Sequence, residues 1–376
     1  MIALALLVMH APLAQQEILV RGRRTGEALK ACLARGCSTP DDARLSIAHA
    51  ESQFAAGQYR NARETLLQAL SRQKANSALY PRHVAALHEA NATVNLHLGD
   101  REAYRAAVRS QADTLRNNLP PDSADVLLTA VRLGDLALKE QDYAGARSLF
   151  EQAAEGYARA GQQRLQALSL LRVVAVDVAR ANHLAARRRL AEVGTLPVAT
   201  DPAVRSTMLV MEARIAAAAG DDQGVERLLA GLKDMPGAPP VLIEAGQRGE
   251  LRPDETSGYL GADAATTRFA SAGVGTRRWA DVGFMIGPDG RVSEVEVLRG
   301  SRDPGRWLGP YLREIATRRY APPALSPDQP GLYRVERYTL RSEFNVPKGS
   351  LVRRPGGHES VEVLDMTKAG TVPPSR

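Results

Sequence analysis

The sequence has few cysteines and few aromatic residues. Only two of its 376 residues are Cys, and Phe, Trp and Tyr together make up 5%. Two cysteines are too few for a disulfide framework or for a structural zinc site, which needs about four ligands. The net charge is +7, but the basic residues are spread along the chain and few aromatic residues accompany them. This pattern argues against a nucleic-acid-binding surface.

A long hydrophobic run is also absent. The most apolar stretch, residues 2–9, is too short to span a bilayer, which needs about 20 apolar residues. Small residues follow as far as Ala14, as in a secretory signal peptide, although no Lys or Arg precedes the run. We therefore expect a signal peptide over residues 1–14, a periplasmic location and no stable membrane span in the mature form. The alternative is a retained anchor in the inner membrane, with the rest of the chain facing the periplasm.

No catalytic or cofactor-binding motif is present in the sequence. The histidines form no H-E-x-x-H pair, and there is no G-x-S-x-G elbow or Walker loop. The acidic pairs Asp41–Asp42 and Asp221–Asp222 precede helical runs, where carboxylates cap exposed N–H groups. We expect neither an enzyme activity nor a cofactor.

The two cysteines, Cys32 and Cys37, have four residues between them. In an exported protein this spacing favours a short-loop disulfide. It would close an N-terminal arm, residues 15–40, just before the first long helical run, and we expect the rest of this arm to be disordered. The alternative is a pair of unbonded thiols.

Residues 41–245 carry a helical pattern that repeats at long range. Similar segments begin at Gly57, Gly99 and Gln141, with 42 residues between successive starts. Weaker copies begin at Ala181 and Gly220, after a further 40 and 39 residues. Each copy predicts a helix, a tight turn at the starting residue, and a second helix with a small or apolar residue five positions on.

The copies resemble tetratricopeptide repeats. In the third copy, the Gly, Tyr, Ala, Phe and Ala of that motif are matched by Gly134, Tyr143, Ala146, Phe150 and Ala153. The resemblance implies an α-helical solenoid, because one helical hairpin cannot bury its apolar face and about three stacked ones can. Such solenoids bind peptides or other proteins. The alternative is a helical bundle that only supports the next domain.

The pattern changes after the repeats. Residues 246–278 are rich in Gly, Pro, Asp and Thr, which predicts a linker. Beyond the linker, apolar residues alternate around Pro288–Asp289–Gly290, which predicts a β-hairpin. A helical run then ends at Pro322–Pro323, and alternation returns from Arg334 to Phe344. The predicted order is strand, strand, helix, strand.

The segment 279–346 resembles the C-terminal domain of TonB, the energy transducer of Gram-negative envelopes. The resemblance lies in the P-D-G turn at Asp289, a V-x-x-V-x-V strand from Val292, a basic-aromatic-x-P motif at Arg319, and a final aromatic at Phe344. It implies a ββαβ domain that binds an extended segment of an outer-membrane receptor along its exposed last strand, through main-chain hydrogen bonds. The partner-binding candidates on that strand are Arg334, Arg337, Tyr338, Leu340, Arg341, Glu343 and Phe344.

The charged candidates have a second explanation, because charges on an edge strand also block random pairing. A transducer would further need a transmembrane helix and a long Pro-rich spacer, and this sequence shows neither.

The predicted fold is thus an α-helical solenoid of tetratricopeptide-like hairpins over 41–245, a linker, a small α+β TonB-C-like domain over 279–346, and a flexible tail over 347–376. The predicted function is a non-enzymatic periplasmic scaffold for protein or peptide partners, among them TonB-dependent receptors. Two alternatives stay open. One is an energy transducer with a retained anchor, and the other is an envelope enzyme whose site the motifs do not reveal.

Overall fold

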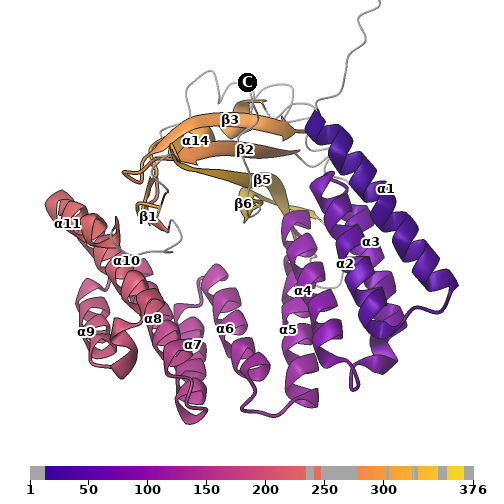
Figure 1. The fold of residues 1–376 in the computed structure, drawn as a ribbon, viewed down its shortest axis with the longest axis horizontal. Coiled ribbons are helices and arrows are strands. Elements are labelled where there is room, and N and C mark those ends of the chain that lie inside the picture. The colour runs from indigo at the N-terminus through magenta and orange to yellow at the C-terminus, as the bar shows by residue number, and fades with distance from the viewer. Residues whose placement is uncertain are drawn as a thin grey trace, which may run out of the picture. The chain divides into compact units, whose positions relative to one another are not determined.

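The computed structural model describes residues 13–233, 241–246, 278–301, 305–323, 325, 329–345 and 354–367. The predicted signal peptide up to residue 12, most of the predicted linker and both ends of the predicted tail lie outside the described residues. The chain divides into two compact units, Met1–Leu119 and Pro120–Arg376 (Figure 1).

The described part of the first unit is helical. A short 3₁₀ turn, Lys74–Asn76, follows the third of its α-helices. The α-helices are α1 (Leu13–Ala34), α2 (Thr39–Ala55), α3 (Tyr59–Gln73), α4 (Pro81–Leu98) and α5 (Arg101–Asn118).

The second unit contains further helices and then a sheet. Its helices are α6 (Ala124–Lys139), α7 (Tyr143–Arg159), α8 (Gln163–Ala179), α9 (His183–Gly194), the 3₁₀ turn Pro197–Thr200, α10 (Pro202–Ala218) and α11 (Asp222–Lys233). They are followed by β1 (Leu242–Glu244), β2 (Arg278–Ile286), β3 (Val292–Gly300), α14 (Gly305–Ala316), β4 (Arg319–Tyr320), β5 (Leu332–Asn345) and β6 (Arg354–Asp365). Within the predicted helical region, the last described helix ends at Lys233, and Leu242–Glu244 form strand β1 instead.

Each helical hairpin turns at a residue in the left-handed conformation. The hairpins α2–α3, α4–α5, α6–α7, α8–α9 and α10–α11 have φ angles of 75°, 68°, 61°, 55° and 71° at Gly57, Gly99, Gln141, Ala181 and Gly220. These are the five residues at which the sequence copies begin. The predicted repeat of helix, tight turn and helix is therefore confirmed.

The residue after the turn caps the second helix in most hairpins. Asp100, Asp142, Asn182 and Asp221 each accept a hydrogen bond from the backbone N–H three positions on. An Asx side chain there satisfies one of the N–H groups that a helix start leaves without a partner. The predicted capping role of Asp221 is confirmed.

The other predicted capping pair behaves differently. Ser38 is the N-cap of α2, and Asp42 lies buried one turn into the helix. Asp42 accepts hydrogen bonds from Arg72 at 2.6 Å and from Gln73 at 2.6 Å. Burial acts to raise the pKa of Asp42, but hydrogen bonds from Arg72, Gln73 and Ser46 outweigh it and leave this pKa below its ordinary value.

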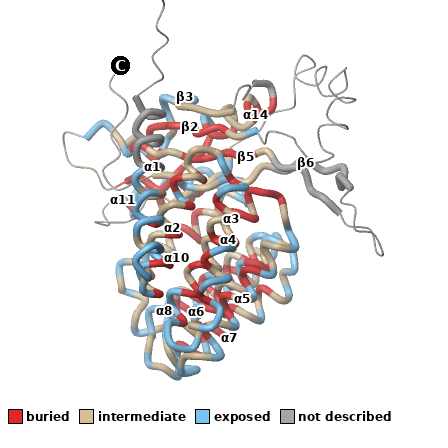
Figure 2. The backbone as a smooth tube through the Cα atoms, turned by 90° about the vertical axis from the view of Figure 1, so that its right-hand side faces the viewer, coloured by how far each residue is buried: buried red, intermediate tan, exposed pale blue. Residues whose placement is uncertain are grey.

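Small residues let the paired helices approach closely. Five positions after the turn, Ala62, Ala146, Ala186 and Val225 are all 0% exposed. Buried residues, red in Figure 2, lie along the helices and through β2. In the third hairpin, a Cβ added to Gly134 would lie 2.5 Å from the Phe150 ring, so only glycine fits there.

The N-terminal arm is a helix rather than a disordered segment. Helix α1 packs on α2, where a Cβ added to Gly26 would lie 3.0 Å from the His49 ring. Thr25 also lies 3.2 Å from Nδ1 of His49. Cys32 and Cys37 form a disulfide with Cα atoms 5.0 Å apart, which ties the end of α1 to the residues before α2. The packing surface on α2 gives the arm the order that its sequence alone does not.

The sheet of the second unit is antiparallel, with strand order β3-β2-β5-β6, and β1 pairs separately with β4. The hairpin β2–β3 closes at Gly287, whose N–H donates to the Arg291 carbonyl, and Gly290 in its turn has a φ of 78°. The predicted hairpin is confirmed, and β2, β3, α14 and β5 follow the predicted order. Phe284, Ile315 and Tyr338 belong to a core shared by the sheet and α14.

The predicted flexible tail contains a strand. β6 pairs with β5 from Glu336 opposite Asp365 to Asn345 opposite Arg354. Residues 360–363 of this strand, S-V-E-V, alternate polar and apolar residues, as a half-buried strand does. The prediction that β5 is an exposed edge is therefore wrong. The edge strands of the described sheet are β3 and β6.

The left-handed turns generate the first prediction. Gln141→Gly and Ala181→Gly should each raise the free energy of unfolding by about 0.5–1 kcal/mol, because a left-handed backbone strains residues that have a Cβ. Gly220→Ala should lower it by a similar amount. An added Cβ at Gly220 meets no atom within 4 Å, so the cost comes only from the left-handed backbone conformation. Urea denaturation followed by circular dichroism measures all three. The assignment would be contradicted if the three substitutions all raised, or all lowered, the free energy of unfolding by the same amount.

Candidate functional site

The first helices of the hairpins in the second unit carry a row of charged side chains. Arg132 and Arg172 stand nine positions before their left-handed residues, and Asp135 and Arg214 stand six positions before theirs. Equivalent positions in stacked repeats lie on the same face. We call the set the first-helix row: Arg132, Asp135, Lys139, Arg172 and Arg214.

The contacts of the row agree with this placement. Arg172 on α8 lies 3.7 Å from Asp135 on α6, with both side chains about half exposed. Lys139 reaches β6 and pairs with Glu362 at 2.7 Å. Burial raises the pKa of Asp135, against the opposing effect of Arg172 and the other basic residues around it. With four cations and one carboxylate, the row is basic.

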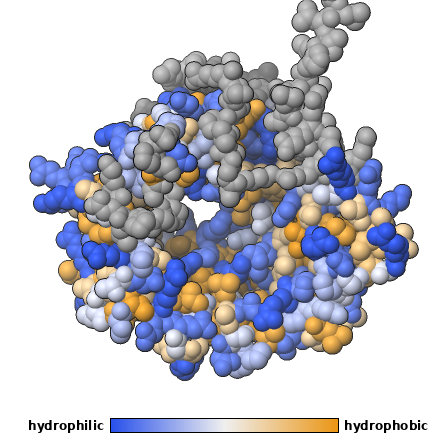
Figure 3. Space-filling model, viewed as in Figure 1, coloured by the Kyte–Doolittle hydropathy of each residue, from blue (hydrophilic) through white to orange (hydrophobic). Residues whose placement is uncertain are grey.

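The surface of the helices around such residues is mixed. Hydrophilic and hydrophobic residues are interspersed over the helices in the view of Figure 3. Large exposed apolar residues such as Leu128, Leu165 and Leu184 each lie at separate positions along α6, α8 and α9. Scattered apolar residues of this kind are normal on a soluble surface. The distinctive chemistry of the region is therefore its arginines.

An extended segment of the chain is bound at one end of the row. Arg214 donates from Nε and Nη2 to the Leu242 carbonyl oxygen, at 3.1 and 2.7 Å. Ile243 is 5% exposed and belongs to the hydrophobic cluster of helices α8 to α11. On its other side β1 pairs with β4, and the Ala321 N–H donates to the Val241 carbonyl at 2.8 Å. The segment is thus held through its main chain and one apolar side chain.

Beside this segment lies a cleft of about 410 Å³. Helices α8, α10 and α11 supply most of its wall, and β1 supplies the rest. Its lining residues are Val178, Arg214, Ala217, Ala218, Asp222, Ile243, Glu244 and Ala245.

Arg337, a predicted partner-binding residue, belongs instead to a buried charge cluster. Its Nη2 donates to Asp281 at 2.9 Å, and Arg299 donates to the same carboxylate at 2.7 Å. The Arg337 guanidinium also lies 4.0 Å from the centre of the Trp279 ring. Because Arg337 is 0% exposed, it holds the sheet together and is not accessible to a peptide.

Tyr338 belongs to a second polar cluster, on the α14 side of the sheet. Its hydroxyl donates to Glu336 at 2.7 Å, and Arg318 donates to the same carboxylate at 2.7 Å. Burial raises the pKa of Tyr338, and the Glu336 carboxylate raises it further, so the hydroxyl keeps its proton. Arg318 also donates to Glu314 on α14, which ties the helix to the sheet.

The remaining candidates lie on β5 between two paired strands. Arg334 pairs with Asp365 of β6 at 2.7 Å, and Leu340 packs against the core of the sheet. Arg341 and Phe344 pair through their backbones with β6, and Glu343 stands within an irregularity of the ladder. The structure therefore brings all seven candidates onto one strand, but not onto an edge. Sequence reasoning missed Arg214 and β1, because the partner of Arg214 is a main-chain carbonyl that no motif reports.

Two further searches cover the described residues only. No group of three or more His, Cys, Asp or Glu side chains within them could hold a metal ion. None of their helices combines the length and apolarity that crossing a membrane requires.

Neither protein-family profiles nor curated proteins match the chain by sequence. Solved structures with stacked helical hairpins are similar to it. BtubC (BKLC) from P. vanneervenii shares 16% identity, with a TM-score of 0.45 over 61% of this chain and 96% of that one. The TPR-like repeats of a Podosopora anserina kinesin light chain share 18% identity, with a TM-score of 0.41 over 52% and 94%. A Rap protein complexed with Competence and Sporulation Factor shares 13%, with a TM-score of 0.41 over 59% and 61%.

The buried cluster around Asp281 generates the second prediction. Asp281→Asn should lower the free energy of unfolding by about 3–5 kcal/mol, because it removes the carboxylate with which the buried Arg337 and the partly buried Arg299 both pair. Arg291→Gln is the matched control in the same sheet, since Arg291 is 68% exposed and its loss should change stability by less than about 0.5 kcal/mol. Thermal and urea denaturation of the full chain measure both variants. A loss for Asp281→Asn as small as the control's would contradict the structural role of the cluster.

Proposed function

We propose that this protein is an interaction scaffold that binds extended segments of partner proteins at the first-helix row. The observation that carries the proposal is β1. Its main chain is recognised by Arg214 on one side and by β4 on the other, while Ile243 enters the helical core. Main-chain hydrogen bonds supply affinity for any extended segment, and side-chain pockets supply selectivity.

The chain's own segments indicate the chemistry of the partner. β1 reads V-L-I-E around its docked residues, and β6 reads E-S-V-E-V-L-D. Both combine apolar residues with carboxylates, and Glu362 of β6 meets Lys139 of the row. Because the row is basic, the partner segment should be extended, apolar and acidic.

The sheet supports a further part of the proposal, a TonB-like module that binds by strand addition. In the core of the sheet and α14, the described buried residues lie on β2, α14, β4 and β5, and Val361 of β6 packs against them partly buried. β6 thus occupies the flank of β5 where a partner strand would add. Addition at β5 would require β6 to leave, and Arg334–Asp365 is one of the ion pairs that would break.

Export to the periplasm is the proposed setting. Residues 1–14 have the apolar run and small residues of a signal peptide. The Cys32–Cys37 disulfide supports an oxidising compartment, because such bonds are rare in reducing ones.

A peptide supplied in trans tests the binding site. The probe is the acetylated and amidated heptapeptide PVLIEAG, which repeats residues 240–246. The chain with Ile243→Ala should bind it more tightly than the unchanged chain, because the weakened β1 competes less. Adding Arg214→Met should weaken binding about 10- to 100-fold, since hydrogen bonds from a charged group are worth roughly 1.5–3 kcal/mol.

Arg205→Met is the control, because Arg205 is exposed on the same helix and should leave binding unchanged. Isothermal titration calorimetry measures the affinities, and circular dichroism confirms that each variant is folded. If the peptide fails to bind, or if Arg214→Met changes nothing, the proposed site is wrong.

Fractionation tests the setting separately. Expressed in a Gram-negative host, the full chain should appear in the soluble periplasmic fraction with Gln15 as its first residue, and its two cysteines should resist alkylation until they are reduced. N-terminal sequencing and mass spectrometry give both results. Retention of Met1 in the inner-membrane fraction would instead support an anchored protein.

A further inference from the structure

The second helices of the hairpins carry their own repeated charge. Six positions after the left-handed residue that closes each of the first four hairpins the chain has an arginine, and the fifth hairpin has Glu226 there. The repeated residues are Arg63, Arg105, Arg147 and Arg187. A residue type that recurs at one repeat position indicates a recurring contact.

Arg147 shows what that contact is in the second unit. It forms an ion pair with Asp177 on α8, the first helix of the next hairpin. Asp177 stands four positions before the left-handed residue Ala181, and its side chain is only 1% exposed. The arginine of one hairpin is thus neutralised by a buried carboxylate of the following hairpin.

Arg187 has no such carboxylate. The position equivalent to Asp177 in the next hairpin, four before Gly220, holds Ala216. Within the part of the chain that the structure describes, Arg187 forms no ion pair. The methyl group of Ala216 is much smaller than an aspartate side chain, so space opens beside this arginine.

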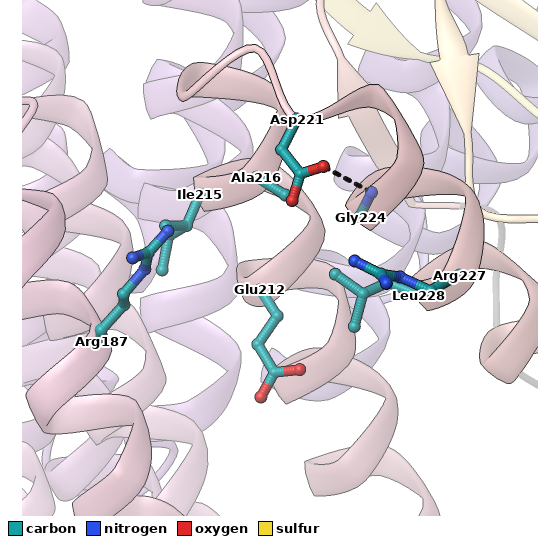
Figure 4. Close-up of a pocket in the computed structure, with 8 residues that line it drawn as sticks. All are labelled: Arg187, Glu212, Ile215, Ala216, Asp221, Gly224, Arg227 and Leu228. Carbon is teal, nitrogen blue, oxygen red and sulfur yellow. Dashed lines mark hydrogen bonds between the residues drawn. The ribbon is translucent and has the colours of Figure 1, made fainter.

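That space is a cleft of about 340 Å³ between α9, α10 and α11 (Figure 4). Arg187 enters it from α9 and Arg227 from α11, and Glu212 of α10 lies lower in this view, with its carboxylate directed away from both guanidiniums. Ile215 and Leu228 add apolar surface. The remaining lining residues are Ala216, Asp221 and Gly224.

The two acidic side chains of the cleft differ in whether a described residue already hydrogen-bonds to them. Asp221 is engaged as the helix cap of α11, where it accepts from the Gly224 N–H at 2.8 Å. Glu212 has no ion pair or hydrogen bond among the described residues, and burial raises its pKa. The cleft therefore offers guanidinium donors together with a free acceptor. A protein segment supplies both a carboxylate for the guanidiniums and a main-chain N–H for Glu212, whereas a free anion such as acetate has no donor for Glu212.

We propose that the Arg187 cleft, defined by Arg187, Glu212, Ala216 and Arg227, binds an aspartate or glutamate side chain from an extended segment of a partner protein. The partner's carboxylate pairs with Arg187 as Asp177 pairs with Arg147. Glu212 accepts a hydrogen bond from the main chain of the same segment. This surface is distinct from the first-helix row, so it does not depend on the proposed function.

Arginine Nε–H signals of the full-length chain, recorded by NMR, test the proposal. The probes are acetyl-Ala-Glu-Ala-amide, its Gln counterpart and sodium acetate, and Arg187→Lys assigns the signal. The Glu peptide should shift the Arg187 signal saturably, and the Gln peptide should bind at least about tenfold more weakly, because a charge-assisted bond is roughly twice as strong as a neutral one.

Ala216→Asp is the decisive variant. It places beside Arg187 the carboxylate that Asp177 offers to Arg147, so it should abolish the response of Arg187 to the Glu peptide. Arg205→Asp, at an exposed position on the same helix, should leave the response intact. Equal shifts with the Glu and Gln peptides, or a response that survives Ala216→Asp, would overturn the proposal. Acetate that binds as tightly as the Glu peptide would overturn the assignment to a protein segment.

Discussion

A helical hairpin covers its apolar face only by packing against a neighbour, and the rest of this structure depends on that constraint. Residues with 0% exposure, such as Ala62 and Ala186, let the helices approach closely enough to share a core. Among the described residues, β1 and then the sheet follow the hairpin α10–α11. Ile243 of β1 and Ala321 after β4 join the hydrophobic cluster of α8 to α11, so the sheet domain closes the helical array. Terminal repeats need such a cap to remain folded and soluble.

The charged residues, like the apolar ones, change their contacts at the last hairpin. The first four hairpins carry an arginine on the second helix, and in the fifth the equivalent residue is Glu226. Glu226 pairs with Arg319 of β4, so the reversed charge meets a cation of the sheet. The ion pair and the apolar cap together fasten the sheet to the last hairpin. Under the proposed function, a partner segment that replaced β1 would also have to replace Ile243 in the core, so binding there would compete with stability.

The sequence predicts the elements whose pattern repeats or alternates over many residues. The hairpins were predictable because the same spacing recurs from Gly57 onward, and the β2–β3 hairpin because its turn residues are specific. Strand β1 has only three residues, and V-L-I-E reads equally well as the end of a helix. β6 alternates only over residues 360–363, and Pro355 and the glycines that follow it point to a tail. Once β6 adds to β5, the predicted edge disappears.

The candidate sites were less predictable than the fold. Their arginines are visible in the sequence, but an arginine-rich chain gives no reason to choose Arg214 or Arg187. Arg214 differs from the other arginines because it donates to a main-chain carbonyl. Arg187 differs because Ala216 stands where the preceding hairpin has Asp177. Recognising these two features requires an alignment of the repeats and knowledge of how the hairpins pack, and composition and local motifs supply neither.

Hydrogen exchange of the amides in residues 241–245, measured by mass spectrometry on the full chain, tests the central claim most directly. If β1 is held between α10 and β4, these amides exchange slowly, and Arg214→Met accelerates them while α4 keeps its protection. Exchange at the rate of an unstructured peptide in the unchanged chain would contradict the account.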